Sequence, residues 1–234
     1  DFQKWVFVKG DQGNNPPGNV SPEGRVLSSG WVGASPDLML FGGVANSGYQ
    51  NDIWKFNSSN KAWSRLSVGG LASDTNPGPR HGAASWTDAS GNLWIFGGMG
   101  EIGDLVQYYN DLWKFNILSK TWIRIRNNEI PVGPGNPPPR RYASTWTDSS
   151  GNLWLFGGGS SNDASSDASP FSCFCIEDYP PEMFEGYPPE VLESIAYKYL
   201  DDLWKYNIAS NIWTWMQGDS LATEPSGKHK YMYM

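Results

Sequence analysis

The chain has 234 residues, 39% of them hydrophobic, and a formal net charge of −7 at pH 7 with a pI near 4.8. Its 13 tryptophans and 27 glycines can supply a large aromatic core, which a disordered chain lacks. It has no basic cluster and no apolar stretch of about 18 residues, so we expect neither a nucleic acid partner nor a membrane span.

One cassette recurs three times, beginning at Arg25, Arg80 and Arg140. Each arginine stands 18 residues before the second glycine of a Phe-Gly-Gly segment, and a pair of tryptophans nine residues apart follows. The copies begin 55 and 60 residues apart. A repeat of this length, with alternating apolar positions and Gly-rich turns, predicts stacked units of four strands, here called a to d. The recurring residues are Gly42, Gly43, Gly97, Gly98, Gly157 and Gly158, with Trp54, Trp63, Trp113, Trp122, Trp204 and Trp213.

The second copy shows the strands most clearly. We expect strand a near 81–88 and a hairpin turn at 88–92, where Gly and Asn supply the positive φ values that such turns need. The apolar run 93–96 is typical of a buried strand b. Alternation over 111–115 predicts strand c, and strand d begins at Trp122.

The double glycine, the downstream aromatic and the tryptophan near the start of strand d together resemble the kelch repeat. The resemblance runs from about Trp5 to Lys228 and implies an all-β fold, a β-propeller built from four-stranded antiparallel blades. We place one propeller domain over 1–234, with full blades at about 19–66, 74–126 and 134–216.

Partial blades flank these three. Residues 1–10 fit an isolated strand d, and residues 224–234 fit the start of a strand a, with Lys228 in the position of the repeated arginine. Three blades with two partial ends do not make the usual ring of about 5 to 7 blades, although rings of about 4 exist. Since the chain also begins with Asp rather than Met, we expect a fragment or the ordered part of a longer propeller.

The loop lengths vary on one face. Antiparallel strands place the a–b and c–d turns on one face of a blade, and the b–c and d–a connections on the other. The b–c connections are residues 44–50, 99–109 and 159–200, whereas the c–d step is constant. Loops on a rigid scaffold commonly carry binding residues, so we predict that partners bind at the b–c/d–a face.

The longest connection contains an acidic insertion, residues 160–199. Its eight carboxylates and the single base Lys198 give a net charge of −7, which equals the formal charge of the whole chain. It also contains a tandem repeat that begins with Tyr-Pro-Pro-Glu. It either docks another subunit or folds back onto its own propeller. The candidate partner-binding residues are Tyr179, Glu182, Phe184, Tyr187, Glu190 and Leu192, with Tyr49, Tyr108 and Tyr109 near the other b–c loops.

Cys173 and Cys175 lie one residue apart inside the insertion. A local disulfide, bonds to a neighbouring chain and free thiols all remain open, and two thiols alone do not make a zinc site. Few lysines and many tryptophans favour an extracellular or cell-surface location, with a cytoplasmic one as the alternative. If the protein is extracellular, we expect a disulfide or intermolecular pairing. We expect no cofactor and no metal.

We expect no catalytic residues. A galactose-oxidase-like copper site needs two histidines converging on the axis, but His81 and His229 share one register next to the repeated Arg or Lys. A residue that recurs in every blade, as the arginine does, is more typical of a structural role. The favoured function is therefore a protein-interaction or structural module, within a larger extracellular assembly. The alternatives are a carbohydrate-binding propeller and part of a sugar-active enzyme whose catalytic residues lie outside this chain.

Overall fold

A computed structural model describes residues 21–33, 37–102, 105–127, 135–161 and 197–218, and within these ranges every regular element is a strand. Three antiparallel sheets hold most of them. Sheet 1 contains β1 (Arg25–Val26), β2 (Ser29–Val32), β3 (Leu38–Ala45), β4 (Gly48–Asn57) and β5 (Ala62–Ser67). Sheet 2 contains β6 (Ala84–Thr87), β7 (Leu93–Phe96), β10 (Leu112–Asn116) and β11 (Thr121–Arg126). Sheet 3 contains β12 (Ser144–Thr147), β13 (Leu153–Phe156), β16 (Leu203–Asn207) and β17 (Ile212–Gln217).

Each sheet has the strand order a-b-c-d, so the prediction of four-stranded antiparallel kelch blades is confirmed. In the second copy, strand b occupies the residues that the sequence indicated, and strands c and d lie within one residue of them. Strand a begins later than expected, at Ala84. The reason is Gly82, whose φ of 63° interrupts the strand after His81.

The a–b hairpins of sheets 2 and 3 are each closed by an aspartate. Asp88 accepts hydrogen bonds from the backbone N–H of Ser90 and Asn92 and from the indole of Trp94, and Gly91 supplies the positive φ. Asp148 closes the third copy in the same way. Short Asx-type turns of this kind fix the register of the following strand b.

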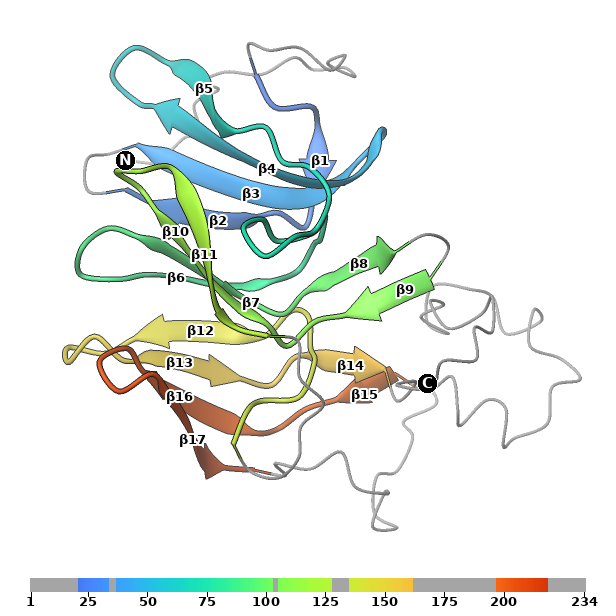
Figure 1. Cartoon of the computed structure of the whole chain (residues 1–234), viewed down its shortest axis with the longest axis vertical. Helices are drawn as coiled ribbons and strands as arrows, with labels where there is room; N and C mark the ends of the chain where they lie inside the picture. Colours follow the sequence, from blue (N-terminus) through green and yellow to red (C-terminus); the bar gives the residue numbers. More distant parts are fainter. Residues whose placement is uncertain (1–20, 34–36, 103–104, 128–134, 162–196, 219–234) are drawn as a thin grey trace, which may run out of the picture.

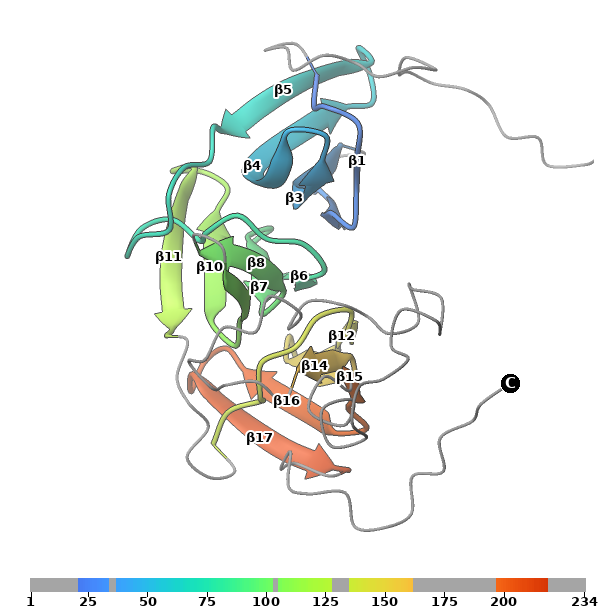
Figure 2. The same ribbon diagram turned by 90° about the vertical axis from the view of Figure 1, so that its right-hand side faces the viewer.

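The three sheets are stacked in chain order (Figure 1). Turned by 90°, they form an open arc, with β5, β11 and β17 along its outer edge (Figure 2). Strand β6 lies beside β2 on one side and β12 on the other, so the first strands form the inner edge. Two aromatic clusters fill the spaces between sheets 1 and 2 and between sheets 2 and 3.

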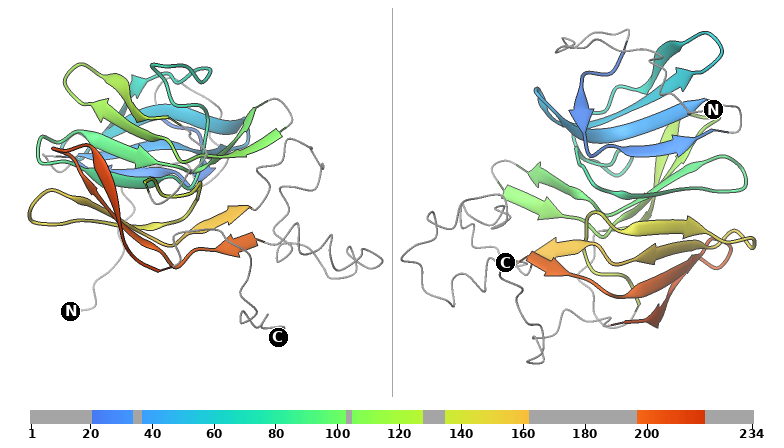
Figure 3. Two further views of the ribbon diagram at one scale, coloured as in Figure 1. Left: turned by 60° about the horizontal axis from the view of Figure 1, so that its bottom comes forward. Right: turned by 180° about the vertical axis from the view of Figure 1, so that it is seen from behind.

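The b–c connections are hairpin arms, a feature that the sequence did not predict. In sheet 2 the arm is β8 (Met99–Ile102) with β9 (Leu105–Tyr108), and in sheet 3 it is β14 (Gly159–Ser161) with β15 (Tyr197–Tyr199). In sheet 1 the ends of β3 and β4 form the equivalent arm. The arm of β8 and β9 and the arm of β14 and β15 project to the same side of the molecule (Figures 1 and 3). They begin at the double glycine, where φ is positive at both positions.

Candidate functional site

A buried ion pair connects the repeated arginine with the aspartate that begins strand c. In the second copy, the Arg80 guanidinium donates to both carboxylate oxygens of Asp111 at 2.6 and 3.0 Å. The indole Nε1 of Trp113 donates to the same carboxylate at 2.7 Å. Arg25 and Arg140 make the same contacts with Asp52 and Asp202. These arginines therefore hold the blade together and are not available to a ligand.

The main chains of Arg80 and Arg140 also join neighbouring sheets. Arg80 donates its N–H to the carbonyl of Gln50 at 3.0 Å and accepts from the N–H of Gly43 at 2.9 Å, both in sheet 1. Its side chain belongs to sheet 2. A Cβ on Gly42 would stand 2.4 Å from the Arg80 carbonyl oxygen, so the close approach requires glycine there.

The segments that follow these arginines converge at the inner edge. Gly82 donates its N–H to the carbonyl of Leu27 at 2.9 Å, and Tyr142 donates to that of Gly82 at 2.8 Å, so one chain of hydrogen bonds crosses all three sheets. The hairpin arms reach the same place. Together they form an inner-edge cluster of five side chains, Tyr49, His81, Tyr108, Arg141 and Tyr142.

The cluster is built from ring contacts. His81 stacks on Tyr49 with ring centroids 5.5 Å apart and planes 20° apart, and its Nδ1 lies 3.2 Å from the Tyr142 hydroxyl. The Arg141 guanidinium carbon stands 4.8 Å from the Tyr142 ring centroid and 5.6 Å from that of Tyr108. Arginine over a tyrosine ring is a favourable cation–π arrangement.

The charge of the cluster resides on Arg141. Burial, and to a smaller extent the nearby Arg141 cation, lower the pKa of His81 from 6.5 to about 4. The imidazole is therefore neutral at pH 7 and takes part as an aromatic ring and a hydrogen-bonding group. The cluster combines one guanidinium with three phenols and one imidazole, and tyrosine and arginine are residue types that are enriched at protein interfaces.

The match to a family model shows which family the chain belongs to. The model of the KLHDC2/KLHL20/DRC7 Kelch-repeats domain matches residues 26–178, which is more than half of the chain. The chain belongs to the kelch-repeat family. Domains of this family typically serve as protein-interaction modules. The resemblance inferred from the repeat itself is thereby confirmed.

Two relatives of this kelch domain are very long proteins. The alpha chain of the flagellar outer arm dynein of Chlamydomonas reinhardtii is 34% identical over 104 residues, which cover 44% of this chain and 2% of the dynein chain. Host cell factor 1 of Homo sapiens and of Rattus norvegicus is 26% identical over 148 residues, 61% of this chain and 7% of the relative. The kelch domain thus spans a small part of the length of each.

The structure brings two of the predicted tyrosines into the inner-edge cluster, Tyr49 and Tyr108. Tyr109, the third tyrosine named as a candidate partner-binding residue, is not presented to a partner. It is 6% exposed, and the guanidinium carbon of Arg80 lies 4.0 Å from its ring centroid. The other candidates lie outside the described residues, namely Tyr179, Glu182, Phe184, Tyr187, Glu190 and Leu192, with Cys173 and Cys175.

The sequence reasoning missed Arg141 and Tyr142. A signal was available, because the position after the repeated arginine varies between copies, as Val26, His81 and Arg141, while the arginine itself does not. Variation at a fixed place in a repeat indicates a side chain that the blade does not need for packing. Such a side chain is free to take a specific role.

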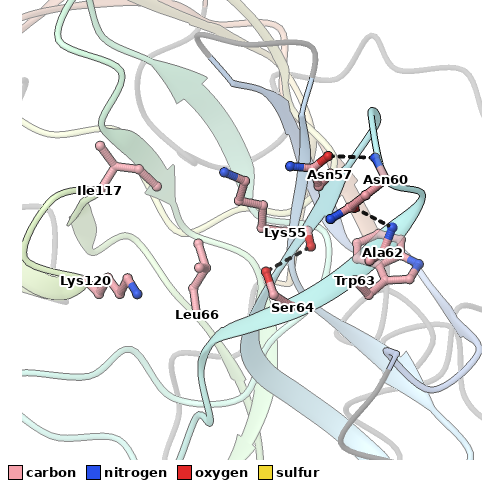
Figure 4. A pocket seen from close by; sticks show the side chains of 9 residues that line it. All are labelled: Lys55, Asn57, Asn60, Ala62, Trp63, Ser64, Leu66, Ile117 and Lys120. Carbon is pink, nitrogen blue, oxygen red and sulfur yellow. Dashed lines mark hydrogen bonds between the residues drawn. The ribbon is translucent and has the colours of Figure 1, made fainter.

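An open pocket lies away from the inner-edge cluster, at the c–d turn of sheet 2, and Figure 4 shows its lining. It has a volume of about 370 Å³ and lies between β5 and this turn, lined by Lys55, Trp63, Leu66, Ile117 and Lys120 among others. Lys55 is paired there with Asp37 at 2.7 Å. Among the described residues, no three His, Cys, Asp or Glu side chains gather as metal ligands, and no helix is long and apolar enough to cross a membrane.

Proposed function

We propose that this kelch domain is a non-catalytic interaction module that binds a partner protein at the b–c face, with the inner-edge cluster at the centre of the contact. The observation that carries the proposal is the gathering of five aromatic and cationic side chains from three repeats on the side where the hairpin arms project. Tyrosine and arginine are enriched among the residues that dominate protein interfaces.

The cluster suits a partner segment with apolar and acceptor groups. The rings of Tyr49 and Tyr108 offer flat apolar surface and are half-buried, so they retain area to lose on binding. Tyr142 is 44% exposed and presents its hydroxyl beside His81. Arg141 is only 7% exposed, so it meets no partner directly; its positive charge lies beneath the tyrosine rings and makes the local potential favourable for carbonyl or carboxylate oxygens.

We further propose that the acidic insertion at 160–199 takes part in docking. Ser161, the last residue of β14, and Tyr197, the first residue of β15, flank its central segment and belong to a hairpin arm of the same face, which supports this proposal. Its eight carboxylates favour a partner with a basic surface, because opposite charges increase the rate of association.

The experiment compares Tyr49→Ala and Tyr108→Ala with Leu118→Ala, a c–d turn residue that is 90% exposed on the opposite face. Cross-linking in cell extract, read by quantitative mass spectrometry, would identify proteins captured by the wild type and the control. We expect at least one partner to be lost about tenfold with both tyrosine variants. Equal capture by all four proteins would disprove the proposed binding face.

Deletion of residues 163–196 tests the insertion separately. If the insertion docks a partner, the deletion weakens capture and leaves the melting temperature unchanged. If it packs on its own propeller, the deletion lowers the melting temperature by several degrees, about 2–4 °C for each kcal/mol lost in a domain of this size.

A second candidate function is carbohydrate binding, which the exposed ring area of Tyr49 and Tyr108 also supports, because aromatic faces stack on sugars. A glycan array distinguishes the two. Binding to one sugar class, lost in Tyr108→Ala and kept in Leu118→Ala, would favour the carbohydrate, and an empty array favours the protein partner.

A further inference from the structure

The two boundaries between sheets have the same apolar pair near their c–d turns. Leu66 of sheet 1 and Ile117 of sheet 2 pack against the aromatic cluster at the first boundary. Ile125 of sheet 2 and Ile208 of sheet 3 occupy the same places of the repeat at the second boundary. A difference between the two boundaries at this end therefore comes from the side chains around the apolar pair.

At the second boundary an arginine crosses from one sheet to the next. Arg126, the last residue of β11, donates from its guanidinium to the main-chain carbonyl of Asn211 in the c–d turn of sheet 3. Thr121 and Ile123 stand earlier in the same strand. Sheets 2 and 3 are thus bridged at this end by a long cationic side chain.

At the first boundary the equivalent positions hold small side chains. Ala62, Ser64 and Ser67 of β5 stand where β11 has a threonine, an isoleucine and an arginine. The Ser67 hydroxyl accepts from the nearby N–H of Gly69 at 3.4 Å, and it is too short to cross between sheets packed about 10 Å apart. The pocket of about 370 Å³ lies here, and we call it the rim pocket. It takes the place that larger side chains occupy at the second boundary.

The rim pocket combines apolar and cationic side chains. Leu66 and Ile117 give it apolar surface, and Lys55 and Lys120 reach it from sheet 1 and sheet 2 (Figure 4). Among the described residues, no aspartate or glutamate lines it. Asp37, just outside it, accepts from Lys55 at 2.7 Å and balances that charge. The excess positive charge of the pocket therefore resides on Lys120.

The backbone of Lys120 is in a conformation that suits another residue better. The position before strand d has a φ of 57° at Lys61, 56° at Lys120 and 58° at Asn211. Asparagine is several-fold enriched in this left-handed region, and lysine is not. Neither lysine has an ion-pair partner among the described residues. A strained lysine where the third copy has the better residue indicates that its charge serves binding rather than packing.

We propose that the rim pocket is a second docking site, which takes an acidic segment of a partner protein. One large apolar side chain of the segment lies against Leu66 and Ile117, where it is removed from water. Neighbouring carboxylates accept hydrogen bonds from Lys120 and from Lys61 in the adjoining turn, and such charge-assisted bonds are the strong ones.

The size and place of the rim pocket agree with this occupant. Its volume lies within the range of about 300 to 1,000 Å³ that is usual for ligand pockets. It stands at the c–d turns, and the strands of each blade separate these turns from the b–c hairpin arms. A partner at the rim pocket therefore leaves the inner-edge cluster accessible to another one.

A random peptide library tests the proposal. The 234-residue chain is used to select short random peptides displayed on phage, and the affinity of each enriched peptide is measured by fluorescence anisotropy. We expect a class of peptides with Asp or Glu around one Leu, Ile, Phe or Trp. Peptides of this class should bind Tyr108→Ala, a variant of the inner-edge cluster, as tightly as the wild type. Selection without this class would overturn the proposal.

Two variants copy features of the second boundary into the first. Lys120→Asn removes the charge and introduces the residue of the third copy, so it should bind the peptides about tenfold more weakly without loss of thermal stability. Ser64→Ile fills the pocket with the residue that β11 has at this register and should weaken binding similarly. Lys205→Gln is the matched control, because it removes one charge from sheet 3. It should bind like the wild type, and circular dichroism checks that all the variants fold.

Three results would contradict the docking site. Equal affinity of the wild type and Lys120→Asn would show that the peptides do not contact this lysine. Equal weakening by Lys120→Asn and Lys205→Gln would show attraction to the net charge alone. Peptides that are lost in Tyr108→Ala and kept in Lys120→Asn would bind at the inner-edge cluster, which would support the proposed function and refute the rim pocket.

Discussion

Arg140 and Asp202 form a doubly hydrogen-bonded ion pair across 62 residues of sequence, with both bonds at 2.6 Å and both side chains completely buried. The connection 159–200, with its acidic insertion, lies between them. Arg140 also donates to the carbonyl of Gly157 at 2.9 Å, at the point where the chain leaves the sheet. The pair therefore closes the base of this connection, which explains how the blade tolerates an insertion of this length.

Replacing Arg140 with Met should destabilise the domain strongly. The substitution leaves the Asp202 carboxylate buried without its cation, and breaking a buried pair on one side costs about 3–5 kcal/mol. Arg25→Met is the matched control, because Asp52 retains 10% exposure and can be partly hydrated, so its loss should be smaller. Urea unfolding followed by tryptophan fluorescence measures both, and equal losses would contradict the role given to burial.

Two buried tryptophans of sheet 3 should differ in how they tolerate phenylalanine. The indole of Trp204 donates to the buried carboxylate of Asp202 at 2.7 Å, whereas no described group accepts from the Nε1 of Trp213. Trp204→Phe removes a hydrogen bond to a charged group, worth about 1.5–3 kcal/mol, and Trp213→Phe removes none. We expect the difference in unfolding free energy to have this size, and the reverse order would refute it.

The sequence predicted the blades well because their signals are local. The strand b at 93–96 is an apolar run, and the turn at 88–92 carries its own Asp, Gly and Asn. Each of these features depends on neighbours within a few residues. The recurrence of Arg80 was also visible in the sequence, but its bond to Asp111 was not, since the two residues stand 31 residues apart.

The inner-edge cluster could not be predicted from the sequence in this way. Tyr49, His81 and Tyr142 belong to three repeats, and their contacts depend on how one sheet is rotated on the next. Periodicity gives the place of a residue within a blade, but not the distance between equivalent places of two blades. Tyr109 was unpredictable for a similar reason, because Arg80, which covers its ring, stands 29 residues before it in the chain.

Two glycines with positive φ should respond differently to alanine. Gly97 has a φ of 68°, and a Cβ there would stand 2.6 Å from the carbonyl oxygen of Arg140 and 2.8 Å from that of Tyr109. Gly91 has a φ of 79° with open space around it. Both variants carry backbone strain of about 1–2 kcal/mol, and the overpacking adds about 1–3 kcal/mol at Gly97 alone.

Thermal unfolding of the two variants tests this difference. Gly91→Ala should melt a few degrees below the wild type, and Gly97→Ala clearly lower again. If both variants have the same melting temperature, the close approach between sheets 2 and 3 at Gly97 adds nothing to the cost of the substitution. The backbone conformation alone would then explain why glycine stands there.

The burial of His81 should make the stability depend on pH. Its pKa is lowered from 6.5 to about 4 in the folded domain, so the unfolded chain takes up a proton between these values that the folded chain refuses. The stability contributed by neutral His81 is therefore complete above about pH 7 and falls as the pH drops to 4. The loss amounts to about 3 kcal/mol at 1.36 kcal/mol for each unit of pKa.

The His81→Gln variant isolates this contribution, because glutamine keeps a hydrogen-bonding group near Tyr142 and does not titrate. Between pH 8 and pH 4, the unfolding free energy of the wild type should fall more than that of the variant, so the two values converge as the pH approaches 4. Asp148 does not mimic the effect, because hydrogen bonds from Asn152 and Trp154 hold its pKa at about 2, so its contribution is lost only below about pH 4. Parallel profiles for the two proteins would show that His81 is protonated as readily in the folded domain as in the unfolded chain.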